Sequence, residues 1–544
     1  MLAGLLAGAV GVCVGFLVAG LTGSVGSPVV AVAEMAIDLS PPALKNFAIK
    51  EFGTNDKLVL QIGVIVVLAV LAAYIGMAAQ RQMSRGLIGV GVFAVIGLIA
   101  AGTRPTAGPV DLLPTLIGSG VAAFTLVRLI RVAGSPSAKI QPAGELPADG
   151  QPTEVPSREE AAARWPRPDR RPAGDARQPA RPTARLAVKE PDRRQFMTLS
   201  AAAAGGAAVA YAGGRLLSER ASVAAAVKSL KLPAAARPVP PLPAGVDLHV
   251  PGLASFITPN SAFYRVDTAI VLPQIPPSSW QLRIHGMVQR EMTLSFGELL
   301  RRPLMEDYIT LCCVSNPVGG PYIGNAKWLG ASLGALLREV GIKAGADQLY
   351  CTSFDGFTSG TPVATAMDGR AAMLAVGMNG KPLPTAHGFP VRTVVPGLYG
   401  YVSACKWITD IEVTTYAANH AYWAQRGWSQ EATIKTESRI DVPSGQNVLK
   451  KGPTVIAGEA WAQHRGIEAV EVRVDRGPWR EATLATVPGI DTWRQWSIPW
   501  DAAPGNHVIE ARATDKTGYT QTALSEPPEP NGATGYPAVQ VKVA

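Results

Sequence analysis

The chain has 544 residues, 47% of them hydrophobic, and a formal net charge of +9. This length is too great for one compact core, so two or three domains are expected. The charge does not indicate nucleic-acid binding, because much of the arginine lies in a Pro/Ala-rich segment near 155–195 rather than among aromatic residues on a folded face. Five cysteines, two of them adjacent, do not form a disulfide framework, and motifs for zinc, iron–sulfur clusters or nucleotide phosphates do not occur.

Apolar stretches in the first 220 residues are long enough to form membrane-spanning helices. They lie at about 2–22, 58–79, 86–102, 110–132 and 197–217. Buried helices of a soluble domain would show a polar stripe, which these stretches lack. We therefore expect an α-helical transmembrane region of four helices over 1–133 and a fifth helix over 193–218. Residues 134–192, rich in Pro, Ala and Arg without apolar periodicity, are expected to form a disordered cytoplasmic linker.

Basic residues beside these stretches predict their orientation. Arg81 and Arg85 lie between the second and third stretches, and Arg128 and Arg131 end the fourth. Because cytoplasmic loops carry excess Lys and Arg, we expect these faces and the amino terminus in the cytoplasm, and the chain beyond the fifth helix outside. The spanning stretches contain no histidine, so a membrane haem with two histidine ligands is not expected in this chain.

A pair of arginines, Arg193 and Arg194, precedes Gln195-Phe196-Met197 and an Ala/Gly-rich apolar run. The pattern is typical both of a twin-arginine export signal and of an ordinary positive-inside anchor. A twin-arginine signal is favoured if the part of the chain after residue 218 binds a cofactor in the cytoplasm, because that part would then have to cross the membrane already folded. Cleavage near residues 222–224 cannot be decided from the sequence.

A β-branched, apolar run from Tyr308 delivers Cys312 and Cys313 to a point where Asn316, Pro317 and paired glycines break regular structure. Adjacent side chains on a strand point to opposite faces, so one thiol can face a site while the other packs into the core. Taken alone, such cysteines are more often small buried hydrophobic residues than ligands.

Three further motifs follow in order. Thr-Leu-x-Cys-x-x-Asn is formed by Thr310 to Asn316, Met-Asn-Gly-x-Pro-Leu-Pro by 378–384, and His-Gly-x-Pro-Val-Arg by His387 to Arg392, with Cys405-Lys406-Trp407 beyond. In this order and spacing, over about 255–544, they resemble the sulfite oxidase family of molybdopterin enzymes.

The resemblance implies a fold and a site. Residues 245–425 would form an α+β molybdopterin domain, and 430–544 an all-β, immunoglobulin-like dimerisation sandwich. The implied site consists of Cys313 as molybdenum ligand, of His387, Arg392 and Lys406 as cofactor-binding residues with Asn260 and Ser403 as weaker candidates, and of Arg265 as a catalytic residue. The alternative for His387 is a structural histidine beside a turn proline.

The sequence departs from the sulfite-oxidising branch at the expected substrate site. Pro317 and Val318 stand where that branch has two arginines, and Phe357 where it has a tyrosine. A sulfite dianion would lose charge-assisted hydrogen bonds that contribute about 1.5–3 kcal/mol each. We therefore expect two-electron oxygen-atom transfer on a less charged S-oxide or N-oxide, with Arg265 as a partial replacement; sulfite oxidation is the alternative.

The expected partners follow from this reading. They are a small-molecule substrate, an external cytochrome or quinone-linked electron carrier, and a second copy of the chain bound through the C-terminal domain. A different class of function, a membrane-anchored binding or structural module without cofactor, remains the competing hypothesis. Whether the four leading helices relay electrons through quinone stays open.

Overall fold

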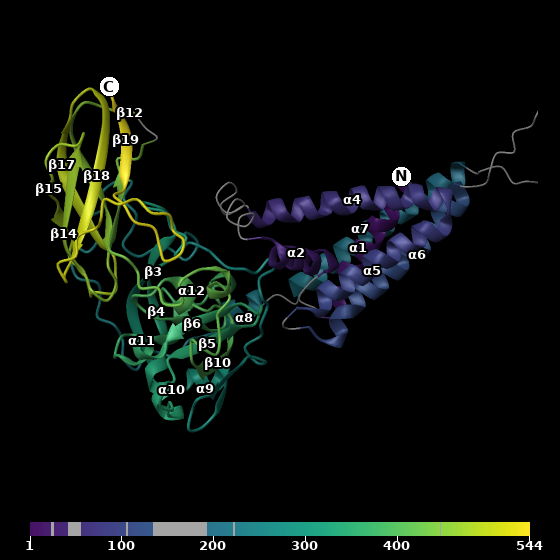
Figure 1. Cartoon of the computed structure of the whole chain (residues 1–544), viewed down its shortest axis with the longest axis horizontal. Helices are drawn as coiled ribbons and strands as arrows, with labels where there is room; N and C mark the ends of the chain where they lie inside the picture. The colour runs from purple at the N-terminus through teal and green to yellow at the C-terminus, as the bar shows by residue number, and fades with distance from the viewer. Residues whose placement is uncertain (23–26, 42–55, 105–106, 134–192, 221–222, 446–447) are drawn as a thin grey trace, which may run out of the picture.

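The computed structural model describes residues 1–22, 27–41, 56–104, 107–133, 193–220, 223–445 and 448–544. Its elements form a helical region, a mixed α+β region and a β-rich region, in chain order (Figure 1). The linker predicted over 134–192 lies outside the described residues. The sequence thus predicted the succession of structural classes along the chain.

The helices of the first region are α1 (Leu2–Thr22), α2 (Pro28–Leu39), α4 (Asp56–Arg81), α5 (Met83–Gly102), η2 (Pro109–Leu112), α6 (Leu113–Ala133) and α7 (Arg193–Arg220). Within the part of the chain that the structure describes, five helical segments are long and apolar enough to cross a membrane, and each overlaps a predicted stretch. Helix α2 was not predicted, because its 12 residues are too few for the spanning window. It packs through Ala31 against Ala100 and Ala101 of α5.

Small residues let the helices of this region approach closely. A Cβ atom added at Gly11 of α1 would lie 2.8 Å from the Cβ of Ala122 in α6. On another part of α1, Phe16 stacks on Tyr211 of α7 with ring centroids 5.6 Å apart. A Cβ atom at Gly214 would come within 2.6 Å of the Phe16 ring. Helix α7 is therefore packed into the same bundle as the leading helices, as small-residue contacts allow (Figure 1).

The mixed region contains two sheets. The first has the order β2 (Met292–Ser295), β1 (Gln281–Gly286), β10 (Ile408–Thr414), β5 (Gln348–Ser353) and β6 (Thr358–Pro362), with β1 and β10 parallel. The second has the order β3 (Leu304–Cys312), β4 (Ile323–Ser332), β7 (Met373–Met378) and β8 (Lys381–Pro382), with β9 (Arg392–Val394) paired to β7. All other paired strands in these two sheets are antiparallel.

Short helices join these strands: α8 (Ala224–Ser229), α9 (Phe296–Leu300), α10 (Leu333–Val340), α11 (Val363–Met367), η3 (Thr385–His387), α12 (Gly400–Ser403) and η4 (Ala424–Arg426). The helix α9, which follows Ser295, begins with a capping box. The Ser295 hydroxyl accepts a hydrogen bond from the Glu298 amide, and the Glu298 carboxylate accepts one from the Ser295 amide. Mixed strands and helices around one core confirm the α+β class.

The C-terminal region consists of two further sheets. One has the order β11 (Glu437–Val442), β13 (Gly452–Trp461), β17 (Arg494–Ala502) and β16 (Thr483–Leu484); the other has β12 (Val448–Leu449), β19 (Ala538–Val543), β18 (Gly505–Asp515), β14 (Ile467–Val474) and β15 (Arg480–Glu481). Their inner faces share a core that includes Ile456, Val470 and Trp496. Trp493 belongs instead to the core of the α+β region, so the two regions meet at that side chain.

Candidate functional site

The two adjacent thiols lie where β3 ends. Strands β3 and β4 pair without a break from Leu304 to Cys312, and the side chain of Cys312 is fully buried in the core. Cys313 follows the strand; its amide donates a hydrogen bond of 2.9 Å to the Tyr322 carbonyl. The Asn316 side chain accepts a 2.7 Å hydrogen bond from the Tyr322 amide, which closes the turn. The predicted division into a core thiol and a strand-end thiol is thus present.

Burial raises the pKa of the Cys313 thiol, and the nearby Lys406 ammonium acts in the opposite direction. Burial also raises the pKa of Cys312 well above its ordinary value. The thiolate of Cys313 therefore requires a positive partner, such as a metal ion, to form at neutral pH.

The motif around His387 folds back on itself. Arg392 is buried, and its guanidinium donates to the main-chain carbonyls of His387 (3.2 Å) and Ala404 (3.4 Å). Gly388 between them has a φ of +105°, and a Cβ atom there would lie 3.1 Å from the Lys406 Cβ atom. Glycine is required for this conformation and this close approach, which bring Arg392 and Lys406 together.

Arg392 is a buried cation whose hydrogen bonds go to carbonyl groups. Burial lowers its pKa to about 10. Among the residues described, no carboxylate forms an ion pair with it, and its guanidinium lies over the Trp328 ring at 5.2 Å. A buried guanidinium without a carboxylate is stabilised by an anion such as a phosphate.

Lys406 and Arg265 share one carboxylate. The Lys406 Nζ atom lies 2.6 Å from Asp267 Oδ2, and the Arg265 Nε atom lies 2.8 Å from the same oxygen. Burial lowers the pKa of Lys406 to about 8, although Asp267 acts to raise it. The side chain of Asp267 is 3% exposed, so this carboxylate offsets two of the site's cations inside the protein.

Asn260 and His387 are joined through the main chain. The His387 Nε2 atom lies 3.1 Å from the Asn260 carbonyl oxygen, so Nε2 carries the proton. Burial, with Arg392 and Lys406 contributing, lowers the pKa of His387 to about 4, so the ring is neutral at pH 7. Its Nδ1 atom then offers a lone pair, a suitable acceptor for a pterin N–H group.

Ser403 lies in α12 and is fully buried. Its hydroxyl contacts the carbonyl oxygens of Leu398 (3.0 Å) and Tyr399 (3.1 Å) in its own turn. These contacts support the turn, and the predicted role of Ser403 in cofactor binding stays a prediction.

Two residues of the cluster were not predicted: Asp267 and Tyr264. The Tyr264 phenol has a pKa raised well above its ordinary value by burial, with contributions from the Cys313 and Cys312 thiols, while Arg392 lowers it. It therefore lies within electrostatic reach of the thiol and the guanidinium. Both residues lie beside Arg265, within residues 263–268. The Arg265–Asp267 pair is local, but Lys406 is 139 positions from Asp267, so the sequence does not show that they share this carboxylate.

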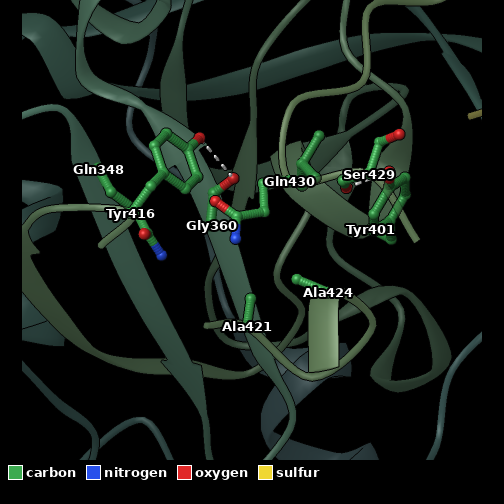
Figure 2. Close-up of a pocket in the computed structure, with 9 residues that line it drawn as sticks. Gln348, Gly360, Tyr401, Tyr416, Ala421, Ala424, Ser429 and Gln430 are labelled. Carbon is green, nitrogen blue, oxygen red and sulfur yellow. Dashed lines mark hydrogen bonds between the residues drawn. The ribbon is translucent and has the colours of Figure 1, made fainter. Parts of the chain in front are cut away.

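A cavity elsewhere in the region is lined by none of the predicted site residues. It has a volume of about 10 Å³ and is lined by nine residues that include Gln348, Gly360 and Tyr416. Figure 2 shows the Tyr416 hydroxyl hydrogen-bonded to the Gly360 carbonyl beside it. Gln348 is fully buried, and neither atom of its side-chain amide has a hydrogen-bond partner among the described residues. A space of this size accepts about one water molecule and no pterin.

The residues of the cluster fit a molybdopterin. One thiol, rather than several, suits a metal whose other ligands come from the cofactor; within the described part of the chain, no three His, Cys, Asp or Glu side chains gather to hold a metal ion. Arg392 suits an anionic end of the cofactor, and the neutral His387 ring suits its heterocycle.

Comparisons with known proteins agree with this chemistry. Residues 269–423 match the family model described as an oxidoreductase molybdopterin binding domain. Sulfite oxidase of Gallus gallus is 30% identical over 317 residues, which cover 49% of this chain and 68% of that protein. The chain belongs to the sulfite oxidase family. It is a molybdopterin-dependent oxidoreductase with a molybdenum cofactor.

Other similar proteins align over 50% to 84% of their own length. Mitochondrial sulfite oxidase of Rattus norvegicus is 31% identical over 274 residues, 42% of this chain and 50% of that protein. The chain thus spans about half the length of that relative. The uncharacterized oxidoreductase YuiH of Bacillus subtilis is 31% identical over 152 residues, 28% of this chain and 73% of that protein. The sulfane dehydrogenase SoxCD from Paracoccus pantotrophus aligns with a TM-score of 0.46 at 24% identity, over 53% of this chain and 84% of that chain.

Proposed function

We propose that this oxidoreductase is tethered to the membrane and reduces a small S-oxide or N-oxide on the extracytoplasmic side. A bound molybdenum cofactor supplies two-electron oxygen-atom transfer. In this proposal Cys313 provides the protein thiolate. Arg392 and Lys406 hold anionic parts of the cofactor, and His387 orients the ring system with the help of Asn260.

The charge balance of the cluster carries the proposal for the substrate. Arg265 and Lys406 share the carboxylate of Asp267, so two cations face one anion before any ligand binds. Arg392 is suited to the cofactor. A sulfite dianion would therefore have to compete with Asp267 for its cationic contacts, whereas an uncharged oxide would not.

The positions that differ from the sulfite-oxidising branch point the same way. Pro317 is exposed and Val318 half-buried, so neither offers a positive charge after Cys313. The Phe357 ring packs against Tyr422 with centroids 5.8 Å apart and cannot donate a hydrogen bond. An apolar lining suits a substrate with a methyl or alkyl group beside its oxide oxygen.

Membrane tethering is supported by how the chain leaves α7. Val223, the first described residue after the helix, is 4% exposed and packs in a core with Phe263 and Met305. Its amide donates a 3.1 Å hydrogen bond to the Gln274 side chain. The helix is thus followed almost at once by the α+β region. We place that region outside the cell and the amino terminus inside, as the basic residues near α4 and α6 indicate.

Partners are part of the same proposal. Electrons would come from an external cytochrome or a quinone-linked carrier. The C-terminal sheets would form an immunoglobulin-like sandwich through which two chains associate. Trp479 is a candidate contact there, because it is half-buried and lies between the guanidinium groups of Arg473 and Arg512 at 4.5 and 4.4 Å.

Metal analysis and anaerobic absorption spectroscopy of the purified full-length chain test this function. We expect about one molybdenum per chain. After chemical reduction, dimethyl sulfoxide or trimethylamine N-oxide should reoxidise the cofactor, whereas sulfite should not rapidly reduce the oxidised protein. Rapid reduction by sulfite would instead establish the activity named for the Gallus gallus and Rattus norvegicus relatives. A folded chain that never contains molybdenum would favour the binding-module hypothesis.

A further inference from the structure

Strand β3, which leads to Cys313, is an edge strand of its sheet. Figure 1 shows it on the side of the α+β region that faces the C-terminal sheets. Its outward main-chain groups at Thr310 are bound by C-terminal residues. The Thr310 amide donates to the Asp491 carbonyl (2.9 Å), and the Thr310 carbonyl accepts from the Gln463 side chain (3.2 Å). The Thr310 hydroxyl also accepts from the Trp493 amide (2.8 Å).

Asn325 lies opposite Thr310 on β4 and extends this contact inward. Its side-chain oxygen accepts from the Thr310 hydroxyl (3.1 Å), and its side-chain nitrogen donates to the Phe256 carbonyl (2.9 Å). The Trp493 indole N–H donates to the same Phe256 carbonyl (3.0 Å). Thr310, Asn325 and Trp493 are at most 1% exposed, so water cannot replace these bonds without opening the interface.

The hydrogen bonds continue to the proposed cofactor residues. The main-chain N–H of Asn325 donates to the Thr258 hydroxyl (3.1 Å), and the side-chain nitrogen of Asn379 donates to the Thr258 carbonyl (2.9 Å). The same Asn379 nitrogen donates to the Asn260 side-chain oxygen (2.8 Å). The Asn260 carbonyl in turn accepts from the His387 ring (3.1 Å). One hydrogen-bond network, buried at the interface and part-buried from Thr258 onward, therefore joins the C-terminal region to His387, while β3 itself leads from Thr310 to Cys313.

We infer that the C-terminal region positions the cofactor site within its own chain, with Gln463 and Trp493 as positioning residues. The inference deepens the proposed function, since it relies on the roles proposed there for Cys313 and His387. Residues that hold metal-site ligands in place act through geometry, and their loss typically weakens metal binding 10- to 100-fold. The C-terminal region is accordingly part of the site's framework as well as a candidate dimerisation surface.

The test uses the full-length, molybdenum-loaded chain in detergent. Trp493→Phe removes the indole N–H while retaining an aromatic ring, and Gln463→Leu removes the amide at similar volume. Thr310→Val removes the shared hydroxyl, whereas Thr310→Ser keeps it. Trp500→Phe is the matched control, because that buried tryptophan of the C-terminal core contacts His507 rather than the network.

We expect the first three variants to lose molybdenum during dialysis about tenfold faster or more than the parent. The g-values of their Mo(V) electron paramagnetic resonance signal should shift, and amide hydrogen exchange should accelerate at 256–264 and 385–392. Thr310→Ser and Trp500→Phe should match the parent in all three measurements.

Unchanged molybdenum retention, spectra and exchange in the first three variants would overturn the inference. The inference would also be overturned if all three variants failed to fold, or if amide exchange became uniformly faster throughout both regions. In either case the network would support the fold as a whole rather than the site. Molybdenum in the parent chain is measured first. If the proposed function is wrong, the parent chain itself contains no molybdenum. If only this inference is wrong, the parent contains molybdenum and the variants do not differ from it.

Discussion

Two neighbouring cysteines of this chain have different surroundings because the strand ends between them. Cys312 has its side chain in the core, with no exposed surface, while Cys313 is 8% exposed and lies near Lys406 and Tyr264. Alternation of side chains along a strand requires this division, and the closed turn at Asn316 fixes where it falls.

Substitution of the two thiols should separate metal binding from stability. Cys313→Ser is expected to abolish molybdenum binding, because a serine hydroxyl is not a thiolate ligand, with little change in unfolding. Cys312→Ser should retain molybdenum and lower the free energy of unfolding by about 1–3 kcal/mol, the cost of a polar group in an apolar core. Metal analysis and denaturation curves measure both. Equal loss of molybdenum in the two variants would refute the assignment of Cys313.

Residue types alone did not reveal how the cations are balanced. Arg265, Lys406 and Arg392 were all predicted as site residues, but the carboxylate that two of them share was not. Lys406 and Asp267 are 139 positions apart in sequence, so no local pattern pairs them. The preference proposed for a weakly charged substrate depends on that pairing.

At the scale of the element, β11 carries a buried carboxyl group at the boundary between the α+β and C-terminal regions. Glu437 is 3% exposed and lies within electrostatic reach of Cys312 and Tyr399. Burial raises its pKa to about 8, and Lys435 offsets this effect only in part. Strand β11 thus places Glu437, a carboxyl group that is largely protonated at neutral pH, near the buried thiol of Cys312.

Glu437 should make the stability of this boundary depend on pH. Its pKa is raised from 4.5 to about 8, so between these values the folded chain binds more protons than the unfolded chain. Stability therefore falls as pH rises from 4.5 to 8. Glu437→Gln should be more stable than the parent at pH 8.5, by on the order of 2–4 kcal/mol, with the difference vanishing below about pH 5.

Denaturation curves at pH 5, 7 and 8.5 measure this effect, with Glu481→Gln, at an exposed position, as the control. A constant difference between parent and Glu437→Gln across these pH values would show that the carboxyl group does not titrate as described.

At the scale of the whole molecule, the leading helices and the α+β region are connected through α7. This helix packs on α1 through Gly214 and Tyr211, and the chain enters the α+β core at Val223. The residue that follows a cleavage at position 222 would already be buried. A peptidase needs an exposed, flexible segment, which the folded enzyme does not offer at Val223.

We therefore expect α7 to remain attached in the mature protein. A chain tagged at its carboxyl terminus should run at full length and stay in the membrane fraction after alkaline carbonate extraction. Immunoblotting and amino-terminal sequencing provide the measurement, and a chain that begins at Val223 serves as a size marker for the cleaved product. Recovery of a soluble fragment that begins near residue 223 would disprove retention.

The sequence by itself determined the features that depend on local composition and on motif order. Apolar length placed five helices near the residues where the structure has them, because a helix that crosses a bilayer must satisfy its backbone within one continuous segment. The motifs from Thr310 to Lys406 indicated the family and brought Cys313, His387, Arg392 and Lys406 into consideration.

The tertiary structure decided what depends on contacts between distant segments. The Trp493 indole reaches the Phe256 carbonyl across 237 positions, and α7 packs on α1 across nearly 200. Periodicity reports which face of an element is buried, but it does not report which other element covers that face. The shared carboxylate, the covered edge of β3 and the packing of α7 on α1 therefore emerged only from the folded chain.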